Sequence, residues 1–158
     1  MQAIFNRVLN YFHLSSGRKK MMIQLSYQLP NLGKILFIIA WIYDFVTTSN
    51  LNHIIIFKIG LTYCITGIIR YLFNRPRPYE KLDIEPLYFH KIGHSFPSRH
   101  CAMGFIVALC CLEINLYIGI IAFINAIGVA ITRFTCGLHY ISDIIGGITL
   151  AYLIYFLL

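Results

Sequence analysis

The chain has 158 residues, which is room for one domain. Hydrophobic residues make up 58% and charged residues only 12%, against roughly 25% charged in soluble domains, so the composition excludes a soluble globular protein. The net charge of +7 comes from cations at the ends of apolar stretches and in one loop, so we expect anionic lipid headgroups or a phosphorylated substrate as partners, and no nucleic acid.

The N-terminal segment has an amphipathic pattern. Over residues 1–14, apolar side chains recur at helical spacing with polar ones between them, at Ile4, Phe5, Val8, Leu9 and Phe12. This pattern predicts a helix that lies in the membrane interface. A break at residues 15–17 and a basic run at 18–20 follow, so residues 1–20 are expected to form an interfacial helix and a topology-fixing anchor.

Five apolar stretches approach the length of a membrane span, which is about 20 residues. They cover residues 32–46, 51–73, 97–112, 116–133 and 140–158. The sequence therefore predicts an all-α, integral membrane helical bundle of about five transmembrane helices, with the interfacial helix at its N-terminus. We expect a single membrane-embedded domain over residues 1–158, with the bundle in 32–158.

Two ionisable residues lie inside the first two stretches. Asp44 and Lys58 are at similar depths on helices expected to be antiparallel neighbours. Ionisable residues are costly in lipid and are usually paired or functional. We hypothesise that they form a structural ion pair.

One long loop, residues 74–96, ends in the stretch His94-Ser95-Phe96-Pro97-Ser98-Arg99-His100. A helix that begins there offers free N–H groups and a partial positive charge, which bind anions. Ser98 adds a hydroxyl, Arg99 a fixed cation, and His100 a group that titrates near neutral pH. Taken alone, the stretch is equally well explained by Ser98 acting as a simple helix cap.

The expected topology brings three polar clusters to one membrane face. Arg70, Arg75 and Arg77 form the first, Ser98-Arg99-His100 the second, and Arg133, His139 and Asp143 the third. Arginines can hold phosphoryl oxygens bidentately. His139 and Asp143 are four residues apart, so the carboxylate can orient the imidazole as a nucleophile, while His100 can protonate a leaving oxygen. We expect no metal, because Arg70, Arg77, Arg99 and Arg133 would repel a divalent cation, and we expect no cofactor.

These clusters resemble the three-part signature of the type-2 phosphatidic acid phosphatase family. The matching residues are Arg70-x6-Arg77-Pro78, Phe96-Pro97-Ser98-Arg99-His100 and Thr132-Arg133-x5-His139-x3-Asp143. The resemblance implies metal-independent hydrolysis of lipid phosphate esters through a phosphohistidine intermediate. It also implies that His139 is the nucleophile, Asp143 its orienting partner and His100 the general acid. The implied phosphate-binding residues are Arg70, Arg77, Ser98, Arg133 and the backbone N–H of Arg99.

The sequence departs from that signature at three positions. Arg70 stands where the family usually has lysine, Arg99 replaces a glycine, and Thr132 replaces a serine. The Arg99 side chain can add a contact to the substrate or can face headgroups. None of the changes removes the catalytic dyad or the acid, so an active enzyme is expected.

The substrate class follows from the resemblance and from a site at the bilayer edge. Phosphatidic acid, phosphatidylglycerol phosphate and undecaprenyl diphosphate all fit, in the bacterial cytoplasmic membrane. The alternative is a non-catalytic membrane protein that binds anionic headgroups. The distribution of cations places the site in the cytoplasm by the positive-inside rule, whereas bacterial relatives commonly place it outside, so the orientation stays open.

Overall fold

The computed structural model describes residues 1–49 and 52–158, and in that part of the chain every regular element is a helix. The elements, in chain order, are α1 (Gln2–His13), α2 (Ser16–Thr48), α3 (His53–Phe73), α4 (Pro78–Lys81), α5 (Arg99–Ile114), α6 (Leu116–Thr135) and α7 (Ile141–Leu157). The expected all-α bundle is confirmed. The start of the second apolar stretch, expected at residue 51, lies outside the described residues.

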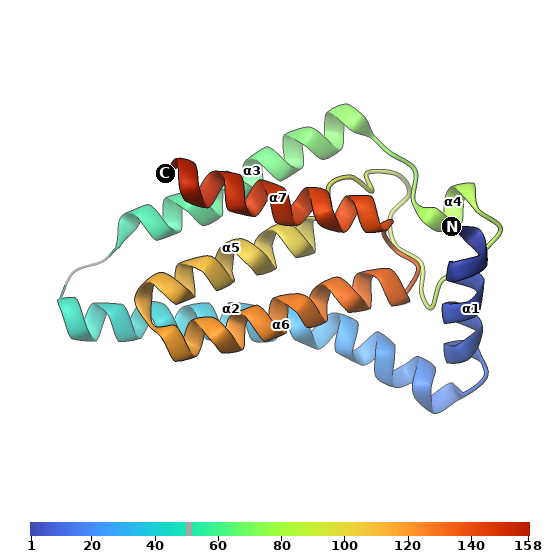
Figure 1. Ribbon diagram of the computed structural model, residues 1–158, viewed down its shortest axis with the longest axis horizontal. Helices are drawn as coiled ribbons and strands as arrows, with labels where there is room; N and C mark the ends of the chain where they lie inside the picture. Colours follow the sequence, from blue (N-terminus) through green and yellow to red (C-terminus); the bar gives the residue numbers. More distant parts are fainter. Residues whose placement is uncertain (50–51) are drawn as a thin grey trace.

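The long helices run lengthwise beside one another, and α5 lies among them (Figure 1). α5 packs against α2, α3, α6 and α7. Its buried face is rich in small side chains, including Cys101, Ala102, Ala108, Cys110 and Cys111, each with no exposed surface. Because lipid is as apolar as leucine, helices in a membrane associate through close packing of small residues rather than through hydrophobic burial. The bundle is therefore held at α5, while many large apolar side chains of the other helices are exposed on the outside.

The amphipathic helix is present where the sequence predicts it. α1 lies across one end of the bundle, next to α4 and the long loop (Figure 1). Its apolar side buries Phe5 and Leu9 in a cluster with Leu87 of the loop and Leu138 of the α6–α7 link. The N-terminal helix therefore supports the two polar connections at this end of the molecule.

The first long helix differs from its predicted bounds. The predicted break is present, since α1 ends at His13 and α2 begins at Ser16. The span expected over residues 32–46 is instead part of one helix of 33 residues, α2, that includes the basic run and Pro30. At 1.5 Å per residue such a helix is about 50 Å long, well over the roughly 30 Å of the hydrocarbon core. The basic residues 18–20 therefore lie on the first turns of α2 itself, beyond its apolar part, and not in a loop.

Three segments of the described chain are long and apolar enough to cross a membrane: Ser16–Thr48, His53–Lys81 and Leu116–Thr135. Ile141–Leu157 is a shorter apolar helix, and α5 has 16 residues. The predicted count of five spans thus stays a prediction.

The predicted pairing of Asp44 with Lys58 is wrong. Lys58 is buried, and its Nζ lies 3.5 Å from Oε2 of Glu113, at the end of α5. The same ammonium lies 4.4 Å from the ring centroid of Tyr155. The sequence placed Asp44 and Lys58 at similar depths, but α3 packs against α5 and α7, so the carboxylate within reach belongs to α5.

Candidate active site

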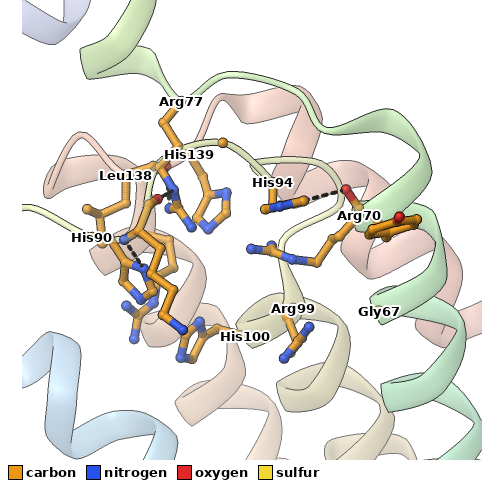
Figure 2. Close-up of a pocket in the computed structure, with 13 residues that line it drawn as sticks. Gly67, Arg70, Arg77, His90, His94, Arg99, His100, Leu138 and His139 are labelled. Carbon is orange, nitrogen blue, oxygen red and sulfur yellow. Dashed lines mark hydrogen bonds between the residues drawn. The ribbon is translucent and has the colours of Figure 1, made fainter.

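The predicted site residues gather around one cavity of about 370 Å³ at the loop end of the bundle. Six of the eight line it: Arg70, Arg77, Arg99, His100, Arg133 and His139. They come from α3, from the long loop, from the first turn of α5, from the last turn of α6 and from the α6–α7 link, and Figure 2 labels all of them except Arg133. Ser98 and Asp143, the other two, are fully buried behind the lining. The convergence expected from the topology is therefore observed.

His139 and Asp143 lie together in the arrangement that their spacing predicts. His139 Nδ1 is 3.5 Å from Asp143 Oδ2, and the side chains are 3% and 0% exposed. Because Nδ1 faces the carboxylate, Nε2 is the nitrogen left for the cavity that His139 lines. A carboxylate on one imidazole nitrogen holds the ring in place and makes the other nitrogen available as a nucleophile.

Ser95 belongs to this group, although the sequence analysis did not single it out. Its hydroxyl donates to Asp143 Oδ2 at 2.5 Å and lies 3.4 Å from His139 Nδ1. The loop is shaped to place it there: Gly93 and His94 both have positive φ, and Ser95 N donates to Arg75 O. The only sequence signal was its position beside the predicted Pro-Ser-Arg-His motif.

Two further donors hold the Asp143 carboxylate. The Tyr140 N–H donates to Oδ2 at 2.9 Å, and Arg75 Nη1 donates to Oδ1 at 2.7 Å. Arg75 also lies over the Tyr140 ring and donates to Ser142 Oγ. Charge-assisted hydrogen bonds of this kind keep a carboxylate ionised and oriented. Arg75 therefore positions Asp143 directly.

Two of the arginines are held rigidly by oxygens of the protein. Arg77 is 2% exposed and donates from Nε to Lys91 O at 2.8 Å and from Nη1 to Leu138 O at 3.1 Å. Arg133 is 3% exposed and donates to Tyr88 Oη and Ser26 O. These acceptors are uncharged, so they do not offset the positive charges of the two guanidinium groups. Both charges can therefore attract an anion in the cavity.

Arg70 connects α3 to the start of α5. Its Nη1 donates to Pro97 O at 3.0 Å, and its own carbonyl oxygen lies 2.8 Å from His94 Nδ1 (Figure 2). Arginine at this position therefore supplies a bond to the motif loop as well as a cation.

The simple cap interpretation of Ser98 is wrong. Ser98 is the N-cap residue of α5, but its side chain makes no cap hydrogen bond, and its buried Oγ has no partner among the described residues. A buried hydroxyl without a partner is costly unless a ligand supplies one. Ser98 N donates to Asp143 O at 2.8 Å, so this hydroxyl is positioned beside the histidine–aspartate pair.

Two glycines of α7 permit this close approach. A Cβ on Gly147 would lie 2.5 Å from Ser98 O, and a Cβ on Gly146 would lie 2.4 Å from the Phe96 ring. Real Cβ atoms do not come so near a backbone oxygen, so the start of α5 can sit against α7 only because residue 147 has no side chain.

Burial lowers the pKa of two histidines that lie on connecting segments. Burial lowers the pKa of His139 to about 4, although Asp143 acts in the opposite direction. Burial, followed by the positive charges of Arg77 and Arg133, lowers the pKa of His90 to about 4. The imidazole of His139 is therefore neutral at pH 7, as a nucleophile must be. Within residues 1–49 and 52–158, no three His, Cys, Asp or Glu side chains gather as metal ligands do.

Comparison with known proteins gives consistent matches. A family model described as the PAP2 superfamily matches residues 53–158, a range that contains every predicted site residue. The undecaprenyl-diphosphatase BcrC of Bacillus subtilis (strain 168) is 25% identical over 158 residues, or 98% of this chain and 80% of that protein.

Two solved structures share the fold. A transmembrane PAP2 type phosphatidylglycerolphosphate phosphatase from Bacillus subtilis matches with a TM-score of 0.77 and 21% identity, over 99% of this chain and 81% of that one. LpxE of Aquifex aeolicus matches with a TM-score of 0.75 and 25% identity, over 98% of this chain and 92% of that one.

Proposed function

The chain belongs to the PAP2 superfamily, and from its site we propose that it is a membrane-embedded lipid phosphate phosphatase that works through a phosphohistidine at His139. The observation that carries this proposal is the His139–Asp143 pair buried beside four arginines that line one cavity. Residues 1–158 act as one phosphatase domain, placed in the bacterial cytoplasmic membrane, as its bacterial relatives suggest.

The first chemical step is transfer of the phosphoryl group to the protein. His139 Nε2 attacks phosphorus, the bond between phosphorus and the lipid oxygen breaks, and His100 donates a proton to that oxygen. Asp143 stabilises the positive charge that develops on the imidazole. The lipid leaves as an alcohol, or as a monophosphate when the substrate is a diphosphate.

The second step returns the enzyme to its starting state. His100, now neutral, removes a proton from water, whose oxygen attacks phosphorus as the bond to His139 breaks. Inorganic phosphate leaves. In both steps charge is spread over the phosphoryl oxygens, where Arg70, Arg77 and Arg133 and the Ser98 hydroxyl stabilise it.

The hydrocarbon chain has a place beside the cavity. A second pocket of about 320 Å³ lies between α2, α5 and α6, has a mostly apolar lining, and shares Arg99 and His100 with the first. A lipid phosphate bound at His139 can therefore keep its chain in an apolar environment. Phosphatidic acid, phosphatidylglycerol phosphate and undecaprenyl diphosphate are the candidate substrates.

Phosphate release by the purified protein in detergent tests the proposal. The three candidate lipids would be assayed with EDTA present, with His139→Ala in parallel. We expect turnover of at least one lipid and its loss in the variant. Binding of these lipids without turnover in either protein would instead support the non-catalytic alternative, in which the arginines only hold anionic headgroups.

A further inference from the structure

Arg99 occupies a place in the site that none of the other arginines shares. It lines both the polar cavity around His139 and the apolar pocket between α2, α5 and α6. Figure 2 shows its side chain on the first turn of α5, on the side of the cavity toward α3. A lipid with its phosphate at His139 and its chain in the apolar pocket passes this side chain.

The Arg99 guanidinium makes a single hydrogen bond to the protein, as does that of Arg70, which donates to Pro97 O at 3.0 Å. Arg77 and Arg133 each donate twice to oxygens of the chain. Arg99, by contrast, makes one long hydrogen bond, 3.3 Å from Nη1 to Tyr63 Oη, and lies 4.8 Å from the centroid of that ring. Its Nε is buried and has no partner among the described residues. A buried donor of this kind needs an acceptor from a ligand.

The charges in the cavity exceed what one phosphate requires. A phosphate monoester has a charge of about −1.5 to −2 at pH 7, and Arg70, Arg77 and Arg133 already supply three positive charges. Arg99 adds a fourth, placed where the substrate leaves the polar cavity. In a lipid diphosphate, the phosphate that is not attacked lies between the reacting phosphorus and the hydrocarbon chain. That is the position of Arg99.

We propose that Arg99 binds the second phosphate of a lipid diphosphate and so makes the enzyme prefer diphosphates to monophosphates of the same lipid. This inference rests on the proposed function, because it needs the terminal phosphate to react at His139. The arginine is a departure from the glycine of the family signature, so this contact is one that the signature residue cannot make.

The test compares farnesyl diphosphate with farnesyl phosphate, which share one hydrocarbon chain. The measured quantity is the ratio of kcat/KM for the diphosphate to kcat/KM for the monophosphate. Arg99→Met removes the cation, and Arg99→Lys keeps the charge without the bidentate geometry. Arg18→Met, which removes a cation that lines neither pocket, is the matched control. We expect the ratio to fall about tenfold or more in Arg99→Met, and less in Arg99→Lys, because a lost charge-assisted bond has that effect.

A ratio in Arg99→Met within about twofold of that in the wild type and in Arg18→Met would overturn the inference, whatever the absolute rates. Should Arg99→Met fail to fold, Arg99→Lys is compared with the wild type instead. The measured quantity is then the ratio of the inhibition constants of inorganic diphosphate and of phosphate. An unchanged ratio of the two inhibition constants likewise overturns it. Failure of the proposed function is a distinct result, in which the wild type and His139→Ala release no phosphate from either lipid.

Discussion

Ser95 donates a hydrogen bond to Asp143 Oδ2, the same carboxylate oxygen that faces the imidazole of His139. The serine comes from the end of the long loop and the aspartate from the first turn of α7. A single hydroxyl therefore connects the loop to the histidine–aspartate pair and fixes the carboxylate against its partner.

The first prediction concerns this connection. We expect Asp143→Asn to lower kcat on the order of 10³- to 10⁴-fold, because an amide no longer orients and stabilises the imidazole. Ser95→Ala leaves the carboxylate its bonds from Tyr140 N and Arg75, so we expect a smaller loss, about tenfold. Steady-state phosphate release measures both.

Ser142→Ala is the matched control, since Ser142 is exposed and its hydroxyl only accepts from Arg75 Nη1, which keeps its own bond to Asp143 Oδ1 in the variant. Its rate should stay within about twofold of wild type. Equal losses in Ser95→Ala and Ser142→Ala would contradict the role given to Ser95.

A second prediction follows from the contact between α5 and α7. In Gly147→Ala the new Cβ would lie 2.5 Å from Ser98 O, so the start of α5 must move. Overpacking of this kind lowers the free energy of unfolding by about 1–3 kcal/mol. The shift also moves Ser98 and His100 relative to the cavity. We expect a lower unfolding temperature in detergent and at least a tenfold lower kcat.

Gly60→Ala provides the comparison, because a Cβ at Gly60 of α3 meets nothing within 4 Å. Alanine favours a helix over glycine by about 0.5–1 kcal/mol, so this variant should be as stable as wild type or slightly more stable. Normal stability and activity in Gly147→Ala would show that α7 is not held against Ser98 as described.

The third prediction is a pH dependence of stability. Burial lowers the pKa of His139 to about 4 in the folded protein, whereas an unfolded histidine has a pKa of about 6.5. As pH falls between these values, the unfolded chain takes up the proton first, so the free energy of unfolding decreases. We expect the unfolding temperature to drop from pH 6.5 toward pH 4, with a shallower slope in His139→Asn. Parallel curves for the two proteins would contradict the buried, neutral state of this imidazole.

A fourth prediction tests the ion pair at the other end of α5. Glu113→Gln leaves the buried Lys58 ammonium without its carboxylate, 3.5 Å away in the native protein. Removing one partner of a pair is destabilising, although Glu113 is partly exposed and water screens part of the effect. We expect a drop of a few degrees in unfolding temperature. Asp44→Asn, which changes the partner suggested by the sequence, should cause no such drop. A drop in Asp44→Asn and none in Glu113→Gln would instead support the pairing of Lys58 with Asp44.

Much of the site could be predicted from the sequence because its members belong to motifs at helix ends. His139 and Asp143 share a helix face by spacing alone, and the antiparallel order of the apolar stretches brings Arg70, Arg99 and Arg133 to one end. The helical class and the position of α1 followed from hydrophobic periodicity in the same way.

What the sequence could not supply depends on packing between distant segments. Ser95 reaches Asp143 because of two successive positive φ angles in the loop, at Gly93 and His94. Lys58 meets Glu113 rather than Asp44 because α3 packs on α5, and helix-to-helix contacts leave no local pattern in the chain. The continuity of α2 through Pro30 does not follow from the sequence, because proline ordinarily marks a helix end.

The central claim is that His139 becomes phosphorylated during turnover. The most direct measurement is to mix the purified protein with a lipid whose phosphate is radiolabelled, quench in alkaline detergent, and map the labelled peptide by mass spectrometry. The account predicts a label on the peptide that contains His139, stable in alkali, lost in acid, and absent from His139→Ala. Phosphate release that continues in His139→Ala, or a label on another residue, would contradict it.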